Sequence, residues 1–247
     1  MTENEWWLPS KLKEVERQAQ ATNDFNDLET SGDFGSYRRL VLGDSLENSN
    51  VSVHNDLIPR SKVQVIKKYL PLGDPHTILD AGCGLGFTTA VLAEFFPKSQ
   101  VLGIDLAEDA IQYAKKTHKK ASFAAITLDP EGERIGIFDV IFCFEIYPFS
   151  RNRNSVYQAN LLNNLASNLS PGGKIIISQT WRNVDALPPV LEEVNQLCHG
   201  LQFKVIPYPH QRIPIWLPKK IALPLAKIGE NLTKKELVKK LIVVTAK

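Results

Sequence analysis

The sequence TILDAGCGLGFTTAVLA occupies residues 77–93 and is the most informative segment of the chain. It begins with an apolar, β-branched run, continues through Gly82, Gly84 and Gly86, and ends with apolar residues at helical spacing before Pro97. This order predicts a strand, a tight glycine loop and a helix. Glycines at such a turn let main-chain N–H groups approach a ligand at the start of a helix. We therefore expect the loop to bind a nucleotide-like ligand.

The spacing of the glycines narrows the class of ligand. A dinucleotide-binding loop has glycines at positions one, three and six, with a pyrophosphate above the last. Counted from Gly82, the sixth position here is Phe87, whose ring argues against a pyrophosphate. Asp80 precedes the first glycine by two residues and completes the pattern acid-x-Gly-x-Gly-x-Gly. This pattern resembles motif I of the class I S-adenosylmethionine-dependent methyltransferases, whose cofactor has no phosphate and carries an ammonium group that favours a nearby carboxylate.

Composition limits the remaining function classes. The chain has 247 residues, 43% hydrophobic and 23% charged, which is typical of a soluble globular protein. The net charge of +2 gives no sign of a nucleic-acid partner. There is no signal-peptide pattern and no apolar run long enough to span a membrane, so we expect a cytoplasmic protein without a transmembrane segment. The three cysteines lack Cys-x-x-Cys spacing and are expected to be buried thiols, with no metal site.

Short apolar strands alternate with amphipathic helices from residue 77 onward, which indicates a parallel sheet. Strands are expected near 77–81, 100–105, 123–127, 138–144, 174–179, 202–207 and 241–246. Helices are expected near 87–96, 107–118, 155–169 and 185–199, with an earlier helix that Ser61 opens.

The resemblance implies a Rossmann-like α/β fold. Its sheet would be doubly wound, mostly parallel and seven-stranded, with an antiparallel terminal strand. Residues 1–58 contain aromatic residues but no strand pattern, and we expect them to form an N-terminal helical cap. The methyltransferase domain would then span 59–247, with 208–232 as a candidate substrate-facing insertion.

The second expected strand ends in Asp105, at the edge where open α/β sheets bind ligands. A carboxylate there can accept hydrogen bonds from both hydroxyls of a ribose, whereas the alternative role is to cap the following helix. Its distance from the glycine loop favours the ribose. Dehydrogenases share this acid, so an NAD-dependent oxidoreductase stays open. The resemblance also places Cys83 and Leu106 beside the cofactor.

The adenine contact is expected just after the third strand. In the resembling family an acid accepts from the adenine amino group, and the N–H of the next residue donates to the ring. Asp129 is followed by Pro130, which has no N–H. We therefore favour Thr127 as the acceptor and Leu128 as the donor, with Asp129 as the close alternative and an ordinary Asp-Pro turn as the other reading.

Two further segments resemble the same family. The strand 138–144 leads into Glu145, and the turn 170–174 precedes the fifth strand. The motif Asn/Asp-Pro-Pro-Tyr of nucleic-acid and amide methylation is absent after the fourth strand. Glu145 and His210 are the candidate catalytic bases, and Glu145 is also a candidate cofactor contact.

The function implied is transfer of a methyl group from S-adenosyl-L-methionine to oxygen, nitrogen or carbon of a small molecule, such as a metabolite, a sugar or a natural-product intermediate. We expect the acceptor pocket to be apolar and lined by Trp6, Trp7, Tyr147 or Trp216. The alternatives are a nucleic-acid methyltransferase, an NAD-dependent oxidoreductase and a catalytically silent binding protein. The oligomeric state stays open, a dimer included.

Overall fold

The computed structural model describes residues 57–144, 146, 149, 154–179, 188–209, 221, 224–225 and 238–247. The chain divides into two compact units, Met1–Val51 and Ser52–Lys247, and all described residues belong to the second. The predicted N-terminal cap and most of the predicted insertion lie outside the described residues.

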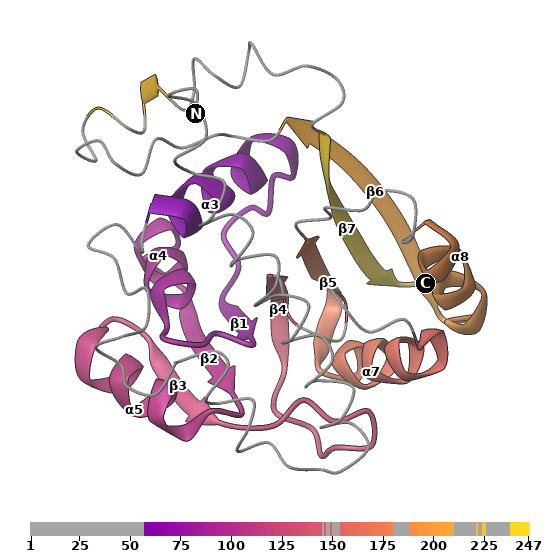
Figure 1. Cartoon of the computed structure of the whole chain (residues 1–247), viewed down its shortest axis with the longest axis horizontal. Helices are drawn as coiled ribbons and strands as arrows, with labels where there is room; N and C mark the ends of the chain where they lie inside the picture. Colours follow the sequence, from indigo (N-terminus) through magenta and orange to yellow (C-terminus); the bar gives the residue numbers. More distant parts are fainter. Residues whose placement is uncertain are drawn as a thin grey trace, which may run out of the picture. The chain divides into compact units, whose positions relative to one another are not determined.

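The described strands form one seven-stranded sheet in the order β3-β2-β1-β4-β5-β7-β6 (Figure 1). Their bounds are β1 (Thr77–Ala81), β2 (Gln100–Asp105), β3 (Ser122–Ala125), β4 (Phe138–Phe144), β5 (Leu169–Gln179), β6 (Leu201–Pro209) and β7 (Val238–Ala246). β1 pairs in parallel with β2 and β4, whereas β7 is antiparallel to both β5 and β6. The predicted doubly wound sheet with an antiparallel terminal strand is confirmed. The strand order reverses between β1 and β4, where open α/β sheets bind ligands.

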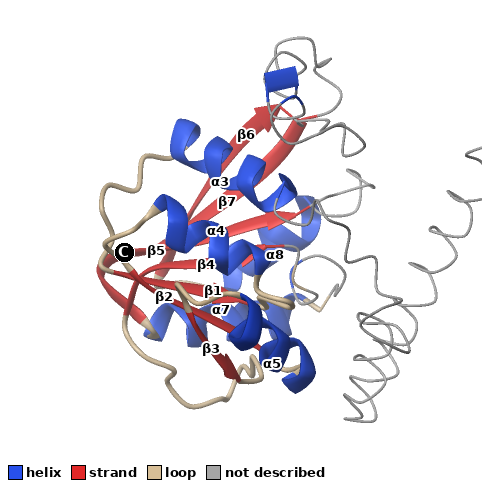
Figure 2. Cartoon of the chain, turned by 90° about the vertical axis from the view of Figure 1, so that its left-hand side faces the viewer, coloured by secondary structure: helices blue, strands red, loops and turns tan. Residues whose placement is uncertain are grey.

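Helices cover both faces of the sheet. The described helices are α3 (Leu57–Tyr69), α4 (Phe87–Phe95), α5 (Glu108–Thr117), α7 (Ser155–Ser167) and α8 (Pro188–Leu197). Side chains alternate along each strand, so Val140 and Phe142 pack with α3 and α4, while Ile141 and Cys143 pack with α7 and α8. Figure 2 shows α3 and α4 in front of the central strands. No helix in the described part of the chain is long and apolar enough to cross a membrane.

Several element boundaries differ from the prediction, among them the start of α3 and the end of β3. α3 begins at Leu57, and Ser61 lies within it; Pro59 is tolerated there because the first helical turn needs no main-chain donor. β3 ends at Ala125, because its partner strand β2 ends at Asp105, which pairs with Ala125. Thr127 therefore lies in the loop beyond the strand.

β5 also begins earlier than predicted, and the turn 170–173 is a bulge within this strand. The pairing of β4 with β5 moves from Phe138 opposite Leu169 to Val140 opposite Lys174. The Ser170 hydroxyl donates to Asp139 Oδ1 at 2.6 Å across the bulge. The predicted turn residues are thus held by the neighbouring strand.

Candidate functional site

The loop between β1 and α4 is tied to the end of β2. The N–H groups of Gly82 and Cys83 both donate to the Ile104 carbonyl at 2.8 Å. The Gly86 N–H donates to the Cys83 carbonyl at 2.9 Å and closes the turn. The glycines have φ angles of 74° at Gly82, 52° at Gly84 and 80° at Gly86. The predicted glycine loop at the start of α4 is therefore present, at the carboxyl ends of the strands.

The surroundings of Gly84 and Gly86 differ. A Cβ on Gly86 would lie 2.7 Å from the Phe123 ring and 2.8 Å from Ala114 Cβ, so the backbone there touches buried side chains. A Cβ on Gly84 would meet no heavy atom of the described residues within 4 Å. Among the described residues, the loop is thus packed at its end and open at its centre, where a ligand can approach the main chain.

Asp105 joins the glycine loop to the segment after β2. Its Oδ2 accepts from the Gly84 N–H at 2.8 Å, and its Oδ1 accepts from the Ala107 N–H at 2.9 Å. The side chain is 7% exposed, and this burial raises the pKa of Asp105 although the surrounding main-chain N–H groups oppose the shift. Each carboxylate oxygen can accept another hydrogen bond. Asp105 can therefore hold the loop and also receive the hydroxyls of a ribose.

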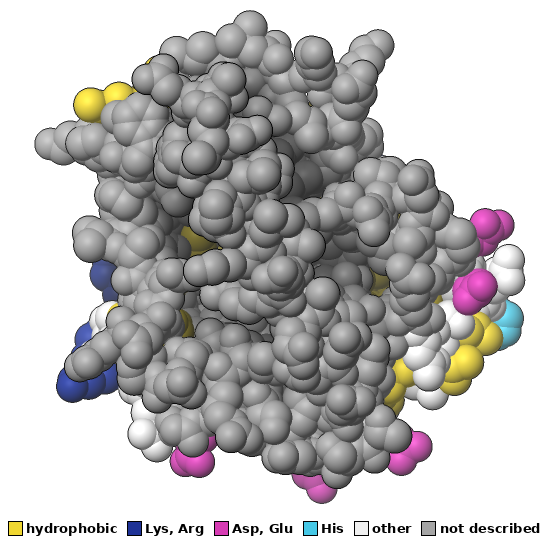
Figure 3. Space-filling view, in the orientation of Figure 1, with side chains coloured by type: hydrophobic (Ala, Val, Ile, Leu, Met, Phe, Trp, Pro, Cys, Tyr) yellow, Lys and Arg dark blue, Asp and Glu magenta, His cyan; other side chains and the backbone are white. Residues whose placement is uncertain are grey.

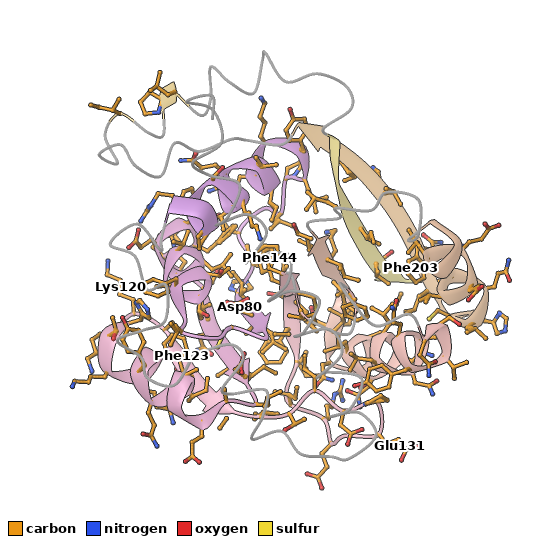
Figure 4. The ribbon with its side chains drawn as sticks, viewed as in Figure 1. Asp80, Lys120, Phe123, Glu131, Phe144 and Phe203 are labelled. Atoms are coloured by element: carbon orange, nitrogen blue, oxygen red, sulfur yellow. The ribbon has the colours of Figure 1, made fainter. Side chains whose placement is uncertain are left out.

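Asp80 lies beneath the loop and points to α4. Its Oδ2 accepts from the Thr89 hydroxyl at 2.6 Å, and both side chains are buried, at 1% and 0% exposed. Burial raises the pKa of Asp80 to about 7, and the nearby charge of Asp105 adds to this, while the Thr89 hydrogen bond and the charge of Lys62 oppose it. Figure 4 shows Asp80 in the interior of the fold. Because Asp80 is buried, a ligand on the loop would interact with the charge of its carboxylate at a distance and would not contact the carboxylate directly.

The segment after β3 begins beside Asp105 and carries the three adenine candidates. The Ile126 N–H donates to the Asp105 carbonyl at 3.0 Å. Asp129 forms a turn, because its carbonyl accepts from the Gly132 N–H at 3.1 Å and its Oδ1 from the Glu131 N–H at 2.9 Å. Thr127 is exposed, and Leu128 packs partly against the core. Asp129 Oδ2 has no bond among those described, so the choice of Thr127 and Leu128 over Asp129 as the adenine contacts stays a prediction.

Two residues near the loop were missed by the sequence reasoning. Thr89 is a polar residue on the buried side of α4, and a buried hydroxyl of this kind requires a partner. Lys62 projects from α3, with its Nζ 5.8 Å from the centre of the Phe144 ring at the end of β4. A cation at this edge had no local sequence signal, because α3 and β4 are distant in the sequence.

The structure describes only some of the other predicted site residues. Cys83 belongs to the loop, and burial raises its pKa, so it is a neutral thiol; the predicted buried thiols are confirmed for all three cysteines. Leu106 follows Asp105 directly and is half-buried. Outside the described residues lie Glu145, His210, Tyr147, Trp6, Trp7 and Trp216.

Positive charge on the described surface is concentrated at the end of α5. Residues 115–120 contain four exposed lysines, Lys115, Lys116, Lys119 and Lys120. Figure 3 shows basic side chains at one edge of this view and acidic side chains at others. Within the described residues, these four lysines form a local basic cluster at the end of α5.

Comparison with known proteins agrees with this geometry. Residues 73–240 match a family model described as a methyltransferase domain. The chain is 30% identical over 116 residues to trans-aconitate 2-methyltransferase of Azoarcus sp. (strain BH72), covering 47% of this chain and 43% of that protein. It is 27% identical over 171 residues to ubiquinone biosynthesis O-methyltransferase of Hydrogenovibrio crunogenus, covering 65% and 60%. The chain thus covers less than two thirds of either relative.

Solved structures share the fold. The plantazolicin methyltransferase BpumL, in complex with a pentazolic desmethylPZN analog and SAH, superposes with a TM-score of 0.53 at 16% identity. The match covers 96% of this chain and 99% of that one. At this level of identity, the likeness concerns the fold alone.

Proposed function

Since the chain belongs to the class I S-adenosylmethionine-dependent methyltransferases, we propose that it transfers a methyl group from S-adenosyl-L-methionine to a small-molecule acceptor. The observation that carries this proposal is the hydrogen bond between Asp105 and the Gly84 N–H. It joins a buried carboxylate at the end of β2 to the open centre of the glycine loop. The cofactor, when bound, supplies the reactive methyl group, so the tasks of the protein are binding and alignment.

Three segments of the described chain would each contact a different part of the cofactor. Asp105 would accept from the ribose hydroxyls, and Thr127 with Leu128 would contact the adenine. The main chain around Gly84 would face the methionine end. Phe87 opens α4 with its ring 5.0 Å from the His118 ring, where a dinucleotide site requires a small residue. This side chain supports S-adenosylmethionine over NAD.

A small acceptor is supported by the named relatives. Their names refer to trans-aconitate, to ubiquinone biosynthesis and to a pentazolic desmethylPZN analog. Glu145 and His210 remain our candidates for a base that removes a proton from such an acceptor. We also infer a cytoplasmic location, which the buried free thiols support.

The decisive experiment is calorimetric titration with S-adenosylmethionine, S-adenosylhomocysteine and NAD. We expect binding heat with the first two ligands and none with NAD. Binding heat with NAD alone would instead support the alternative of an NAD-dependent oxidoreductase. Production of S-adenosylhomocysteine with a small acceptor excludes a silent binding protein. Methylation of RNA or DNA but of no metabolite would instead support the nucleic-acid alternative, with residues 115–120 as its first contact.

Thr127→Val is expected to weaken S-adenosylhomocysteine binding by about 1 kcal/mol, because it removes one neutral hydrogen bond to the adenine. Titration calorimetry measures the change. Asp129→Ala is the matched control and should change the affinity less, since its carboxylate holds the turn at Glu131. A larger loss for Asp129→Ala would place the adenine contact there.

A further inference from the structure

Helix α5 is joined to the glycine loop at both of its ends. At its start, the N–H groups of Ala107 and Gly84 donate to the two oxygens of Asp105, at 2.9 and 2.8 Å. At its end, His118 Nε2 lies 3.2 Å from the carbonyl oxygen of Leu85, the next residue of the loop. The ribose role proposed for Asp105 accounts for the first connection but not for the second.

The contact between His118 and Leu85 has a defined direction. A carbonyl oxygen only accepts hydrogen bonds, so the imidazole has to carry a proton on Nε2. The His118 ring lies edge-on to the Phe87 ring, with the ring centres 5.0 Å apart, and its centre is 6.2 Å from that of Phe123. The main-chain N–H of His118 donates to the Ala114 carbonyl at 2.8 Å. Both the ring and the backbone of His118 are therefore held in place beside the loop.

The Leu85 carbonyl belongs to the peptide group that joins Leu85 to Gly86. This peptide group is planar, and its N–H donates to the Cys83 carbonyl at 2.9 Å, so a bond at each side fixes its orientation. Glycines occupy both neighbouring positions, Gly84 and Gly86, and their backbones turn more freely than those of other residues. The orientation of this peptide group therefore depends on its two hydrogen bonds, of which His118 supplies one.

We propose that His118 is a positioning residue for cofactor binding, which holds the peptide group between Leu85 and Gly86 in the orientation that the bound cofactor requires. His118 acts through the main chain of the loop and has no need to touch the ligand. Without this donor the half-buried Leu85 carbonyl loses its partner, and the loop relaxes to expose it to water. Ligand binding then has to restore the original loop, which lowers the affinity. This inference rests on the proposed function, because it requires the cofactor to bind at this loop.

Two substitutions separate the hydrogen bond from the packing of the ring. His118→Phe keeps an aromatic ring against Phe87 and Phe123 but has no donor. His118→Gln loses the ring, whereas its side-chain amide can carry an N–H group to the place of Nε2. If His118 served packing alone, phenylalanine would be the better replacement. Because we assign it the role of a donor, we expect glutamine to be the better one.

The test is calorimetric titration of the natural chain and both variants with S-adenosylhomocysteine at pH 7.5, with urea unfolding to show that each variant is folded. We expect His118→Phe to lower the affinity about tenfold, or about 1.4 kcal/mol, which lies within the cost of leaving a buried acceptor unpaired. His118→Gln should bind within about twofold of the natural chain, because it again supplies a donor to Leu85. His199→Phe is the matched control and should leave the affinity unchanged, since His199 is exposed between α8 and β6.

The natural chain provides a second test that does not depend on the folding of a variant. Burial lowers the pKa of His118, so at pH 7.5 its ring is neutral and carries one proton. Proton–nitrogen correlation NMR of the histidine side chains distinguishes the two tautomers. We expect the His118 proton on Nε2. A proton on Nδ1 would leave Nε2 unable to donate to Leu85 and would overturn the inference.

The other outcomes are also distinct. Equal affinities of the natural chain and His118→Phe would overturn the inference. An equal or larger loss in His118→Gln than in His118→Phe would overturn it as well, because it would assign the ring to packing. Each of these results leaves the proposed function intact. Absence of S-adenosylhomocysteine binding to the natural chain would instead overturn the proposed function.

Discussion

Gly86→Ala is expected to destabilise the protein by about 3 kcal/mol and to abolish measurable S-adenosylhomocysteine binding. A side chain at a φ of 80° costs about 1–2 kcal/mol, because its Cβ crowds the following carbonyl. The new methyl group would also overlap Phe123 and Ala114, which are both buried, and overpacking of this kind costs about 1–3 kcal/mol. Urea unfolding measures the first effect and titration calorimetry the second.

Gly84→Ala is the matched control for this prediction. Its φ of 52° is also positive, but the added methyl group would meet no described atom within 4 Å, so we expect a stability loss of only about 1 kcal/mol. Binding should nevertheless fall sharply, because the methyl group occupies the open centre of the loop. Equal destabilisation by the two substitutions would contradict our account of the packed and open parts of the loop.

Asp105→Ala is expected to lower the affinity for S-adenosylhomocysteine at least 100-fold. Two hydrogen bonds from the ribose to a charged acceptor contribute roughly 1.5–3 kcal/mol each, so their loss exceeds the 2.7 kcal/mol that corresponds to about 100-fold. The substitution also leaves the N–H groups of Gly84 and Ala107 without their acceptor, which should reduce stability. Calorimetry and urea unfolding on the same preparation separate the two effects.

A loss of stability without a loss of affinity would identify Asp105 as a helix-capping residue that does not bind the cofactor. Asp129→Ala serves as the control, since it also removes a carboxylate after a neighbouring strand. That carboxylate accepts from the Glu131 N–H within its own turn. We expect this control to retain most of the affinity.

Much of the fold could be predicted because it depends on local patterns. β1, β2 and β4 begin and end where the apolar runs predicted, since each run is buried on both faces of a central strand. The bulge in β5 could not be predicted, because it depends on a hydrogen bond from Ser170 to another strand. Such pairing across strands has no local signature in the sequence.

The site shows the same division. The glycine spacing and the position of Asp105 indicated that both belong to one site, but not that Asp105 accepts from Gly84. Asp80 was identified by its place in the motif, whereas its partner Thr89 follows nine residues later on a helix. The bond between them depends on how α4 packs against the sheet. Sequence patterns therefore predicted where the motif residues lie better than the contacts that hold them in place.

The insertion of β7 between β5 and β6 has a consequence for biosynthesis. Within the described sheet β6 pairs only with β7, although β6 precedes it in the sequence. During translation β6 therefore emerges from the ribosome without a strand to join, and the edge of β5 stays uncovered until residues 238–246 follow. Unpaired strand edges are prone to aggregate, so we expect a nascent chain paused before β7 to be prone to aggregation.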